Sequence, residues 1–244
     1  MVAKIIIPCY NAENYINQCI KSLQAQDETS FEVAIVNDAS TDDTQKVAGK
    51  AIGTDGRFCI IEKDENGGPL SSLVTGIKYL DPKDSDTIAV IDGDDLLITS
   101  HALSLVKQTY EKHDCLITYG SFATASGRQY PDTGKRYSHE TITQRSYRTA
   151  PWRASHLRTF RHYLWRNIKD QDLRDPSGRY WKAATDLAAM FPMLEMAGER
   201  QQALQERIYG YRDNLTTNQH QTNRPRQLEN ERLIRSMKAY AVLG

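Results

Sequence analysis

Residues Thr87–Asp95 read TIAVIDGDD, a short apolar run that passes directly into a cluster of acidic residues. Such a run is typical of a strand buried on both faces, as in a parallel sheet. In open parallel sheets the ligand lies beyond the carboxyl ends of the strands. The cluster Asp92-Gly93-Asp94-Asp95 therefore stands where a binding site is expected.

Apolar runs and helical patterns alternate on either side of this stretch. Further strands are predicted at Lys4–Pro8, Phe31–Asn37, Phe58–Glu62 and Leu116–Tyr119. Helical spacing predicts helices between them: near 16–23, from a capping box at 40–43, near 70–77 and at His101–His113. Strands separated by helices indicate βαβ units. The predicted fold class is α/β, with a mainly parallel, Rossmann-like sheet flanked by helices.

The second half has weaker periodicity. Ser121–Ser155 is predicted to form loops with short strands, the usual place for a substrate site. Helices are expected at Leu157–Ile168 and Ala183–Ala197, and a late strand at Ile208–Tyr211. A polar loop over Asn214–Arg226 and a terminal helix over Leu228–Val242 complete the prediction.

The chain shows no repeat and no clear linker, which favours one domain over residues 1–212 with an extension at 213–244. Within the domain, 1–121 is expected to bind the donor and 122–212 the acceptor.

The amino-acid composition argues against several classes of protein. Among 244 residues, 31 Lys and Arg balance 31 Asp and Glu, which argues against general nucleic-acid binding. No apolar run approaches the ~18–20 residues that span a bilayer, and Met1–Pro8 is too short for a signal peptide. The four cysteines form no CxxC pair, which favours reduced core residues in a cytoplasmic protein over zinc or disulfides.

The acidic cluster predicts a metal site. Three carboxylates within four residues repel one another unless a cation compensates them. All-oxygen ligands select a hard ion, Mg²⁺ or Mn²⁺, and such an ion can hold a diphosphate. Gly93 lets the backbone approach a ligand closely. The alternative is a solvated acidic turn that caps the next helix.

Two more polar clusters follow predicted strands, Pro8-Cys9-Tyr10-Asn11 and Asn37-Asp38-Ala39-Ser40. Asp38 can accept from a base N–H or a ribose hydroxyl, or it can stabilise a turn. Tyr10 can stack on a base or pack at a helix start. The three clusters are expected to meet at one edge of the sheet.

Their combination and order resemble the family 2 glycosyltransferases over roughly the first half of the chain. The matching stretches are Ile5–Ile16, Ser22–Gln26, Phe31–Val33, Asn37–Asp42 and Asp92–Asp95. The resemblance implies a GT-A fold, a nucleoside-diphospho-sugar donor, Mn²⁺ or Mg²⁺, and inversion of the anomeric centre.

The resemblance also assigns donor and metal positions. Pro8, Tyr10 and Asp38 resemble nucleoside-contacting positions, with Asn11 beside them, and Asp92 resembles the acid near the ribose. Asp94 and Asp95 resemble the pair near metal and ribose, without fixing which is the ligand. The turn Asn66-Gly67-Gly68 resembles one that lines the donor pocket, or it is only a helix entry. His220 resembles a late histidine at the metal or diphosphate, or it is solvated.

An inverting transfer needs a base for the acceptor hydroxyl. Thr185-Asp186-Leu187 resembles the family segment that carries it, although Thr185 replaces the usual glutamate. Asp186 is therefore the predicted base. The alternatives are a favourable place in a first helical turn and competition from Asp170, Asp172 or Asp175.

Trp152, Arg153, His156 and Arg158 are candidate acceptor-binding residues, because a loop with aromatic and basic groups can bind a sugar or a phosphate. The alternative is a solvated loop without a binding role. Six arginines between 145 and 166 point to a phosphate-bearing acceptor or a membrane surface. The acceptor is thus expected to be a glycan, a lipid-linked molecule or a protein, with peripheral membrane contact.

The favoured function is transfer from a nucleoside-diphospho-sugar, with UDP as the expected carrier. One alternative is a nucleotide-sugar-binding protein without turnover. Another is a nucleotidyltransferase like the sugar-nucleotide pyrophosphorylases, but these need a Gly-rich loop with Arg and Lys after the first strand. This chain has Pro8-Cys9-Tyr10-Asn11 there.

Overall fold

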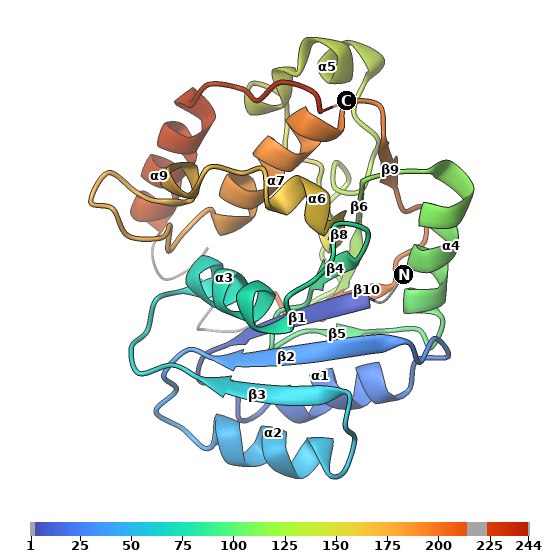
Figure 1. Cartoon of the computed structure of the whole chain (residues 1–244), viewed down its shortest axis with the longest axis vertical. Helices are drawn as coiled ribbons and strands as arrows, with labels where there is room; N and C mark the ends of the chain where they lie inside the picture. Colours follow the sequence, from blue (N-terminus) through green and yellow to red (C-terminus); the bar gives the residue numbers. More distant parts are fainter. Residues whose placement is uncertain (1–2, 214–223, 244) are drawn as a thin grey trace.

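A seven-stranded sheet with helices on both faces forms the centre of the molecule (Figure 1). The computed structural model describes residues 3–213 and 224–243. In sheet order the strands are β3 (Phe58–Glu62), β2 (Phe31–Asn37), β1 (Ala3–Cys9), β4 (Thr87–Val90), β8 (Ser155–Arg161), β6 (Ile117–Gly120) and β9 (Gln201–Ala203). Only β8 of these runs antiparallel to its neighbours, β4 and β6. The predicted α/β class with a mainly parallel sheet is confirmed.

The strands near the middle are apolar throughout because both faces of the sheet are covered. On β1, Ile5 and Ile7 pack into one core, and Ile6 between them packs into the other. The first core is closed by α1 (Ile16–Gln24), α2 (Thr44–Ile52) and α4 (Ala102–His113). The second is closed by α3 (Pro69–Leu80), α6 (His162–Trp165) and α7 (Thr185–Ala197).

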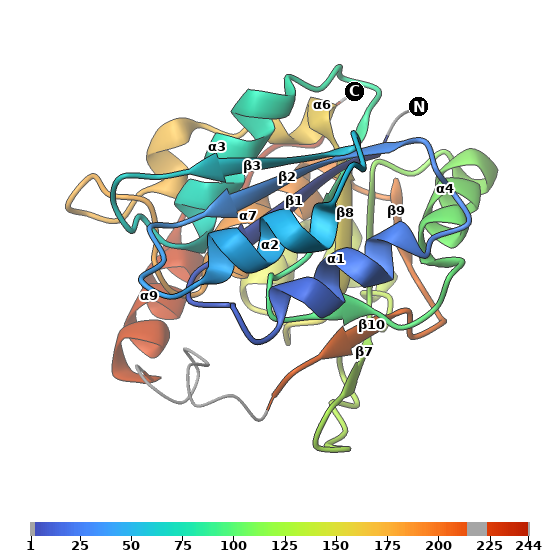
Figure 2. The same ribbon diagram turned by 90° about the horizontal axis from the view of Figure 1, so that it is seen from below.

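A second, small sheet lies beside the carboxyl end of β4. It consists of β5 (Leu96–Leu97), β10 (Tyr209–Tyr211) and β7 (Phe122–Thr124). Figure 2 shows β10 and β7 side by side, away from the helices α3 and α7. This sheet brings the late strand next to the acidic turn that follows β4.

The predicted helix at Leu157–Ile168 is wrong over its first half. The segment enters the sheet as β8, and only His162–Trp165 is helical. Leu157, Phe160 and Leu164 have helical spacing, which misleads a local reading. The segment forms a strand because β4 and β6 leave room for one more strand between them. Thr159 pairs with both strands, and its hydroxyl lies 2.6 Å from that of Thr118.

Smaller differences concern helix boundaries. Helix α2 begins at Thr44, not at the predicted capping box, because the Asp42 carboxylate accepts from the Thr44 N–H at 3.0 Å. The stretch predicted as loops and short strands also contains α5 (His139–Gln144) and the 3₁₀ turn η1 (Ser146–Arg148). Another 3₁₀ turn, η2, spans Asp170–Leu173.

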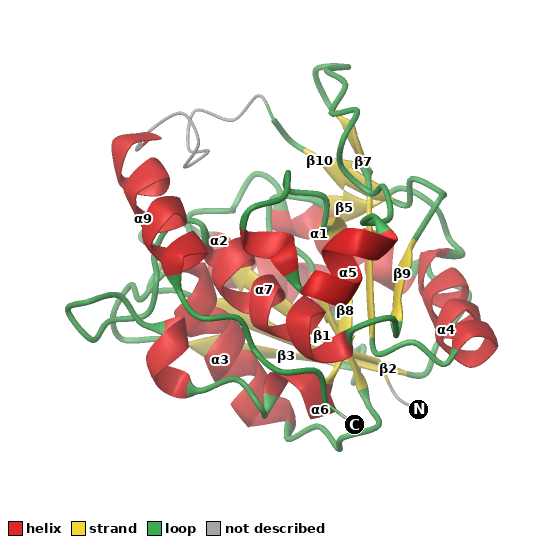
Figure 3. Cartoon of the chain, turned by 90° about the horizontal axis from the view of Figure 1, so that it is seen from above, coloured by secondary structure: helices red, strands yellow, loops and turns green. Residues whose placement is uncertain are grey.

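The last helix, α9 (Arg224–Ser236), lies against α7 (Figure 3). Its start and end both precede the predicted ones. A buried ion pair fixes this end of the chain: Arg148 donates to Glu195 at 2.6 and 3.0 Å and to the Ile234 carbonyl at 2.7 Å. The Tyr240 N–H donates to the same carboxylate at 2.9 Å. Within residues 3–213 and 224–243, no helix is long and apolar enough to span a bilayer.

Candidate active site

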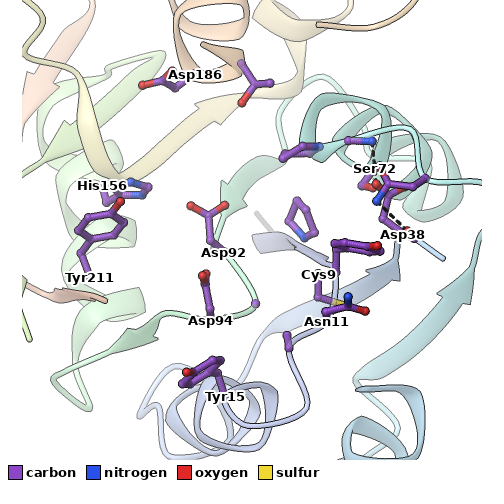
Figure 4. Close-up of a pocket in the computed structure, with 18 of the residues that line it drawn as sticks. Cys9, Asn11, Tyr15, Asp38, Ser72, Asp92, Asp94, His156, Asp186 and Tyr211 are labelled. Carbon is purple, nitrogen blue, oxygen red and sulfur yellow. Dashed lines mark hydrogen bonds between the residues drawn. The ribbon is translucent and has the colours of Figure 1, made fainter. Parts of the chain in front are cut away.

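A cavity of about 510 Å³ opens at the carboxyl ends of β1, β2 and β4 (Figure 4). The starts of α3, β8 and α7 close it from the other side, together with Tyr211 and Gln227. Nine of the ten predicted donor-site residues line it: Pro8, Tyr10, Asn11, Asp38, Asn66, Gly68, Asp92, Gly93 and Asp94. Gly67 does not, but its backbone N–H helps to hold Asp38.

The loops after β1 and β2 are tied together by Asn11. Its N–H donates to the Ser40 hydroxyl at 3.0 Å, and its side-chain oxygen accepts from the Thr41 N–H at 2.8 Å. These bonds keep both strand ends at the cavity. Tyr10 is half exposed beside them, which leaves its ring available to a planar ligand.

Asp38 fixes the turn before α3. The Gly67 and Gly68 N–H groups donate to its two oxygens at 3.0 and 2.7 Å, and Lys63 donates to Oδ1. A carboxylate accepts about four hydrogen bonds. One acceptor position on Oδ2 therefore remains for a ligand N–H or hydroxyl. Of the two roles considered for Asp38, the structure shows the turn residue, and the role as ligand acceptor stays a prediction.

Gly93 allows the acidic turn to lie against the end of β1. Its N–H donates to the Pro8 carbonyl at 3.0 Å. A Cβ atom at this position would meet Cys9 Cβ at 2.6 Å, closer than real Cβ contacts. Glycine is therefore required here by the close approach of two strand ends.

Asp92 and Asp94 project into the same open space (Figure 4). Burial raises the pKa of Asp94 to about 6, and the neighbouring Asp92 charge adds to the shift. Burial and the charge of Asp186 raise the pKa of Asp92, although Arg158 opposes the change. Two carboxylates that resist ionisation together fit a site for a divalent cation.

Asp95 faces the protein interior and is 1% exposed. Its oxygens accept from the Tyr209 hydroxyl at 2.8 Å and from the Arg212 N–H at 2.9 Å. The same hydroxyl accepts from the Asp92 N–H at 3.1 Å. This arrangement argues against Asp95 as a metal ligand and favours Asp94. Asp95 instead fastens β10 to the acidic turn.

One predicted metal ligand is not covered by the part of the chain that the structure describes. His220 lies outside the described residues. Within residues 3–213 and 224–243, no three His, Cys, Asp or Glu side chains cluster closely enough to hold a metal alone. Two carboxylates still fit Mg²⁺ or Mn²⁺, because such ions are commonly bound by one or two carboxylates together with substrate phosphates.

Asp186 lies across the cavity from Asp92, in the first turn of α7 (Figure 4). Arg158 lies between them, with nitrogen–oxygen distances of 3.7 Å to Asp92 and 4.0 Å to Asp186. Asp170, Asp172 and Asp175 do not line the cavity. Of the four carboxylates considered as a base, only Asp186 faces the donor region.

The four candidate acceptor residues separate into two pairs. His156 and Arg158 line the cavity. Trp152 does not line it and packs edge-on against Phe191 with ring centroids 5.5 Å apart, and Arg153 donates to the Arg136 carbonyl at 3.1 Å. Since β8 is antiparallel, its first residues meet the carboxyl end of β4, which brings His156 and Arg158 to the site.

The arginines between 145 and 166 do not form one basic surface. Arg148 is buried in its ion pair, and Arg158 faces the cavity. Arg161 donates to the Thr87 hydroxyl at 3.2 Å, and Arg166 pairs with Asp84 at 3.0 Å. This dispersal removes the observation that pointed to a membrane surface.

Several lining residues were not predicted, among them Tyr15, Ser72, Tyr211 and Gln227. Tyr211 ends the late strand, and its position after an apolar run was the available signal. Its ring stacks against His156 with centroids 5.7 Å apart. Tyr15 directly precedes α1, and Ser72 and Gln227 lie on α3 and α9; none of the three carries a sequence pattern that marks it as a site residue.

The chain belongs to glycosyl transferase family 2, whose model matches residues 4–169. The uncharacterized glycosyltransferase EpsJ of Bacillus subtilis (strain 168) is 26% identical over 216 residues, covering 87% of this chain and 61% of that protein. A teichoic acid poly(glycerol phosphate) polymerase of Staphylococcus epidermidis is 30% identical over 169 residues, covering 63% of this chain and 23% of that protein. The chain thus spans less than two thirds of these relatives.

Solved structures share the fold. S. aureus TarS 1–349 in complex with UDP-GlcNAc has a TM-score of 0.72 at 23% identity, covering 96% of this chain and 65% of that one. The mannosyltransferase PcManGT of Pyrobaculum calidifontis, in complex with GDP-Man and Mn²⁺, has a TM-score of 0.64 at 18% identity, with coverages of 98% and 65%. The predicted GT-A fold and the family resemblance are confirmed.

Proposed function

We propose that this protein transfers a sugar from a UDP-sugar to a hydroxyl acceptor with inversion, using Asp186 as the base. One observation carries the proposal: Asp38 after β2, Asp92 and Asp94 in the turn after β4, and Asp186 in α7 come from three separate parts of the fold and line a single cavity. Membership of the family supports transfer of a sugar. The TarS complex with UDP-GlcNAc supports uracil as the nucleobase of the donor.

The cavity accommodates the nucleotide on the side of β1 and β2. The half-exposed Tyr10 ring offers a stacking surface for the base, and the remaining acceptor position of Asp38 suits a base N–H. Asp92 lies towards the ribose and the sugar. This order directs the sugar C1 towards Asp186, on the opposite wall.

Asp186 removes the proton from the acceptor hydroxyl as its oxygen forms a bond to C1. The bond between C1 and the diphosphate oxygen breaks at the same time, and the nucleoside diphosphate leaves from the opposite face. A base in hydrogen-bond reach of the hydroxyl contributes about 10²–10⁴-fold to such a step. The position of Asp186, across the cavity from Asp92 and Asp94, supports this role.

Asp94, with Asp92 beside it, would hold Mn²⁺ or Mg²⁺. When bound, the cation supplies positive charge to the departing diphosphate. The raised pKa of Asp94 supports this assignment, and so does the Mn²⁺ in the PcManGT complex. The acceptor is proposed to be a glycan.

Calorimetry with UDP and release of UDP from UDP-sugars test the proposal together. We expect UDP to bind more tightly with Mn²⁺, and Asp186→Asn to keep this affinity while losing about 10²–10⁴-fold of turnover. Asp170→Asn is the matched control, because Asp170 pairs with Arg174 outside the cavity. Undiminished turnover of Asp186→Asn would show that another group is the base.

The same assay separates the alternatives. A nucleotide-sugar-binding protein would bind UDP-sugars and release no UDP with any acceptor. A nucleotidyltransferase would form UTP from UDP-sugar and pyrophosphate.

A further inference from the structure

A small side pocket opens from the main cavity between α3 and α7. Its volume is about 40 Å³. The residues that it shares with the main cavity form its mouth, and they are Pro8, Pro69, Asp92, Arg158, Thr185 and Asp186. Its walls are apolar and consist of Leu70, Leu73, Val90, Phe160, Ala189 and Met190. The pocket therefore combines a charged mouth with an apolar interior.

Arg158 is the unusual group at this mouth. Its side chain is only 12% exposed, and its contacts with Asp92 and Asp186, at 3.7 and 4.0 Å, exceed hydrogen-bond length. Within the part of the chain that the structure describes, its enclosed Nε has no hydrogen-bond partner, and its terminal nitrogens face these two carboxylates only at ion-pair distance. Buried donors without acceptors cost about 1–3 kcal/mol each, so the guanidinium is suited to an oxygen brought by the ligand.

The charges at the mouth select the kind of oxygen. A phosphate or carboxylate would lie beside the carboxylates of Asp92 and Asp186 and be repelled by them. A neutral oxygen avoids this cost. A hydroxyl alone would leave the apolar walls unfilled, because 40 Å³ exceeds the ~10–15 Å³ that one water-sized group needs. The best fit is a carbonyl oxygen joined to one methyl group.

We infer that the donor sugar carries an acetamido group, whose methyl enters the side pocket and whose carbonyl accepts from a terminal N–H of Arg158. This inference rests on the proposed function. The mouth lies between Asp92, on the donor side, and the base Asp186, so it adjoins the reacting C1. A substituent on the neighbouring C2 is within reach of it. Arg158, predicted as an acceptor-binding residue, then determines donor specificity.

Matched donors test the inference. Calorimetry with Mn²⁺ compares UDP-GlcNAc with UDP-glucose, and UDP-GalNAc with UDP-galactose, with UDP as the reference ligand. We expect each acetamido donor to bind at least about tenfold more tightly than its hydroxyl counterpart, since one methyl-sized group in an apolar pocket is worth about 10–200-fold. Equal affinities within both pairs would overturn the inference and leave the proposed function standing.

A variant with a filled side pocket tests whether the acetamido group binds there. Ala189→Leu adds three carbon atoms to the pocket wall and is expected to remove the acetamido preference while UDP affinity stays at the wild-type level. Ala188→Leu is the matched control, because Ala188 is buried in the same helix but does not line the pocket. A preference that survives Ala189→Leu would overturn this location. Absence of UDP binding by the wild-type protein would overturn the proposed function, and this inference with it.

Discussion

Replacing Asp94 by asparagine is expected to stabilise the metal-free protein and to abolish its response to Mn²⁺. The pKa of Asp94 is about 6 in the folded chain, compared with an ordinary value of 3.8. Between about pH 4 and pH 6 the folded state therefore binds a proton that the unfolded state releases. The free energy of unfolding falls as the pH rises through this window and stays low above it.

The size of the effect follows from this shift. About two pKa units correspond to about 3 kcal/mol, and screening by solvent at this partly exposed side chain reduces the figure to about 1–3 kcal/mol. In a chain of this length each kcal/mol changes Tm by about 2–4 °C. Asp94→Asn should thus raise Tm by about 3–10 °C at pH 7.5, with little gain at pH 4.

Thermal unfolding in EDTA and then in Mn²⁺, at several pH values, measures both effects. Mn²⁺ should raise the Tm of the wild-type protein at pH 7.5 by binding only the folded state, and should leave Asp94→Asn unchanged. Asp114→Asn is the matched control, because the Asp114 side chain is 91% exposed. A lower Tm of Asp94→Asn in EDTA at pH 7.5, or a retained Mn²⁺ response, would refute the reasoning.

Two further variants test the frame around the site. Arg148→Met removes the ion-pair partner of the buried Glu195 carboxylate and should lower the free energy of unfolding by about 3–5 kcal/mol, measured by chemical unfolding. Adding Glu195→Leu should restore most of this stability. An Arg148→Met variant as stable as the wild-type protein would contradict the prediction. Gly93→Ala forces a Cβ against Cys9 and should cost about 1–3 kcal/mol by the same measurement and weaken UDP binding. Wild-type UDP affinity would show that the acidic turn tolerates the shift.

Local sequence patterns were sufficient to predict a strand where the side chains on both of its faces are buried. The runs at Lys4–Pro8 and Phe31–Asn37 are apolar because helices cover both faces of the sheet, so their strands could be predicted. The position of the three polar clusters could be predicted as well, because they follow strands whose carboxyl ends meet at one edge of the sheet. The segment after Ser155 could not, since its choice between helix and strand depends on β4 and β6, which are remote in the chain.

The amino-acid sequence alone predicts a group of carboxylates directly after the strand of TIAVIDGDD, because adjacent residues encode both the buried strand and the acidic turn that follows it. Which of these carboxylates face the cavity depends on the tertiary structure. Asp94 lines the cavity, whereas Asp95, one residue later, turns inward to Tyr209. Only the fold also placed Arg158 between Asp92 and Asp186. The physical reason is that side-chain direction in a turn is set by contacts with distant segments, which no local pattern records.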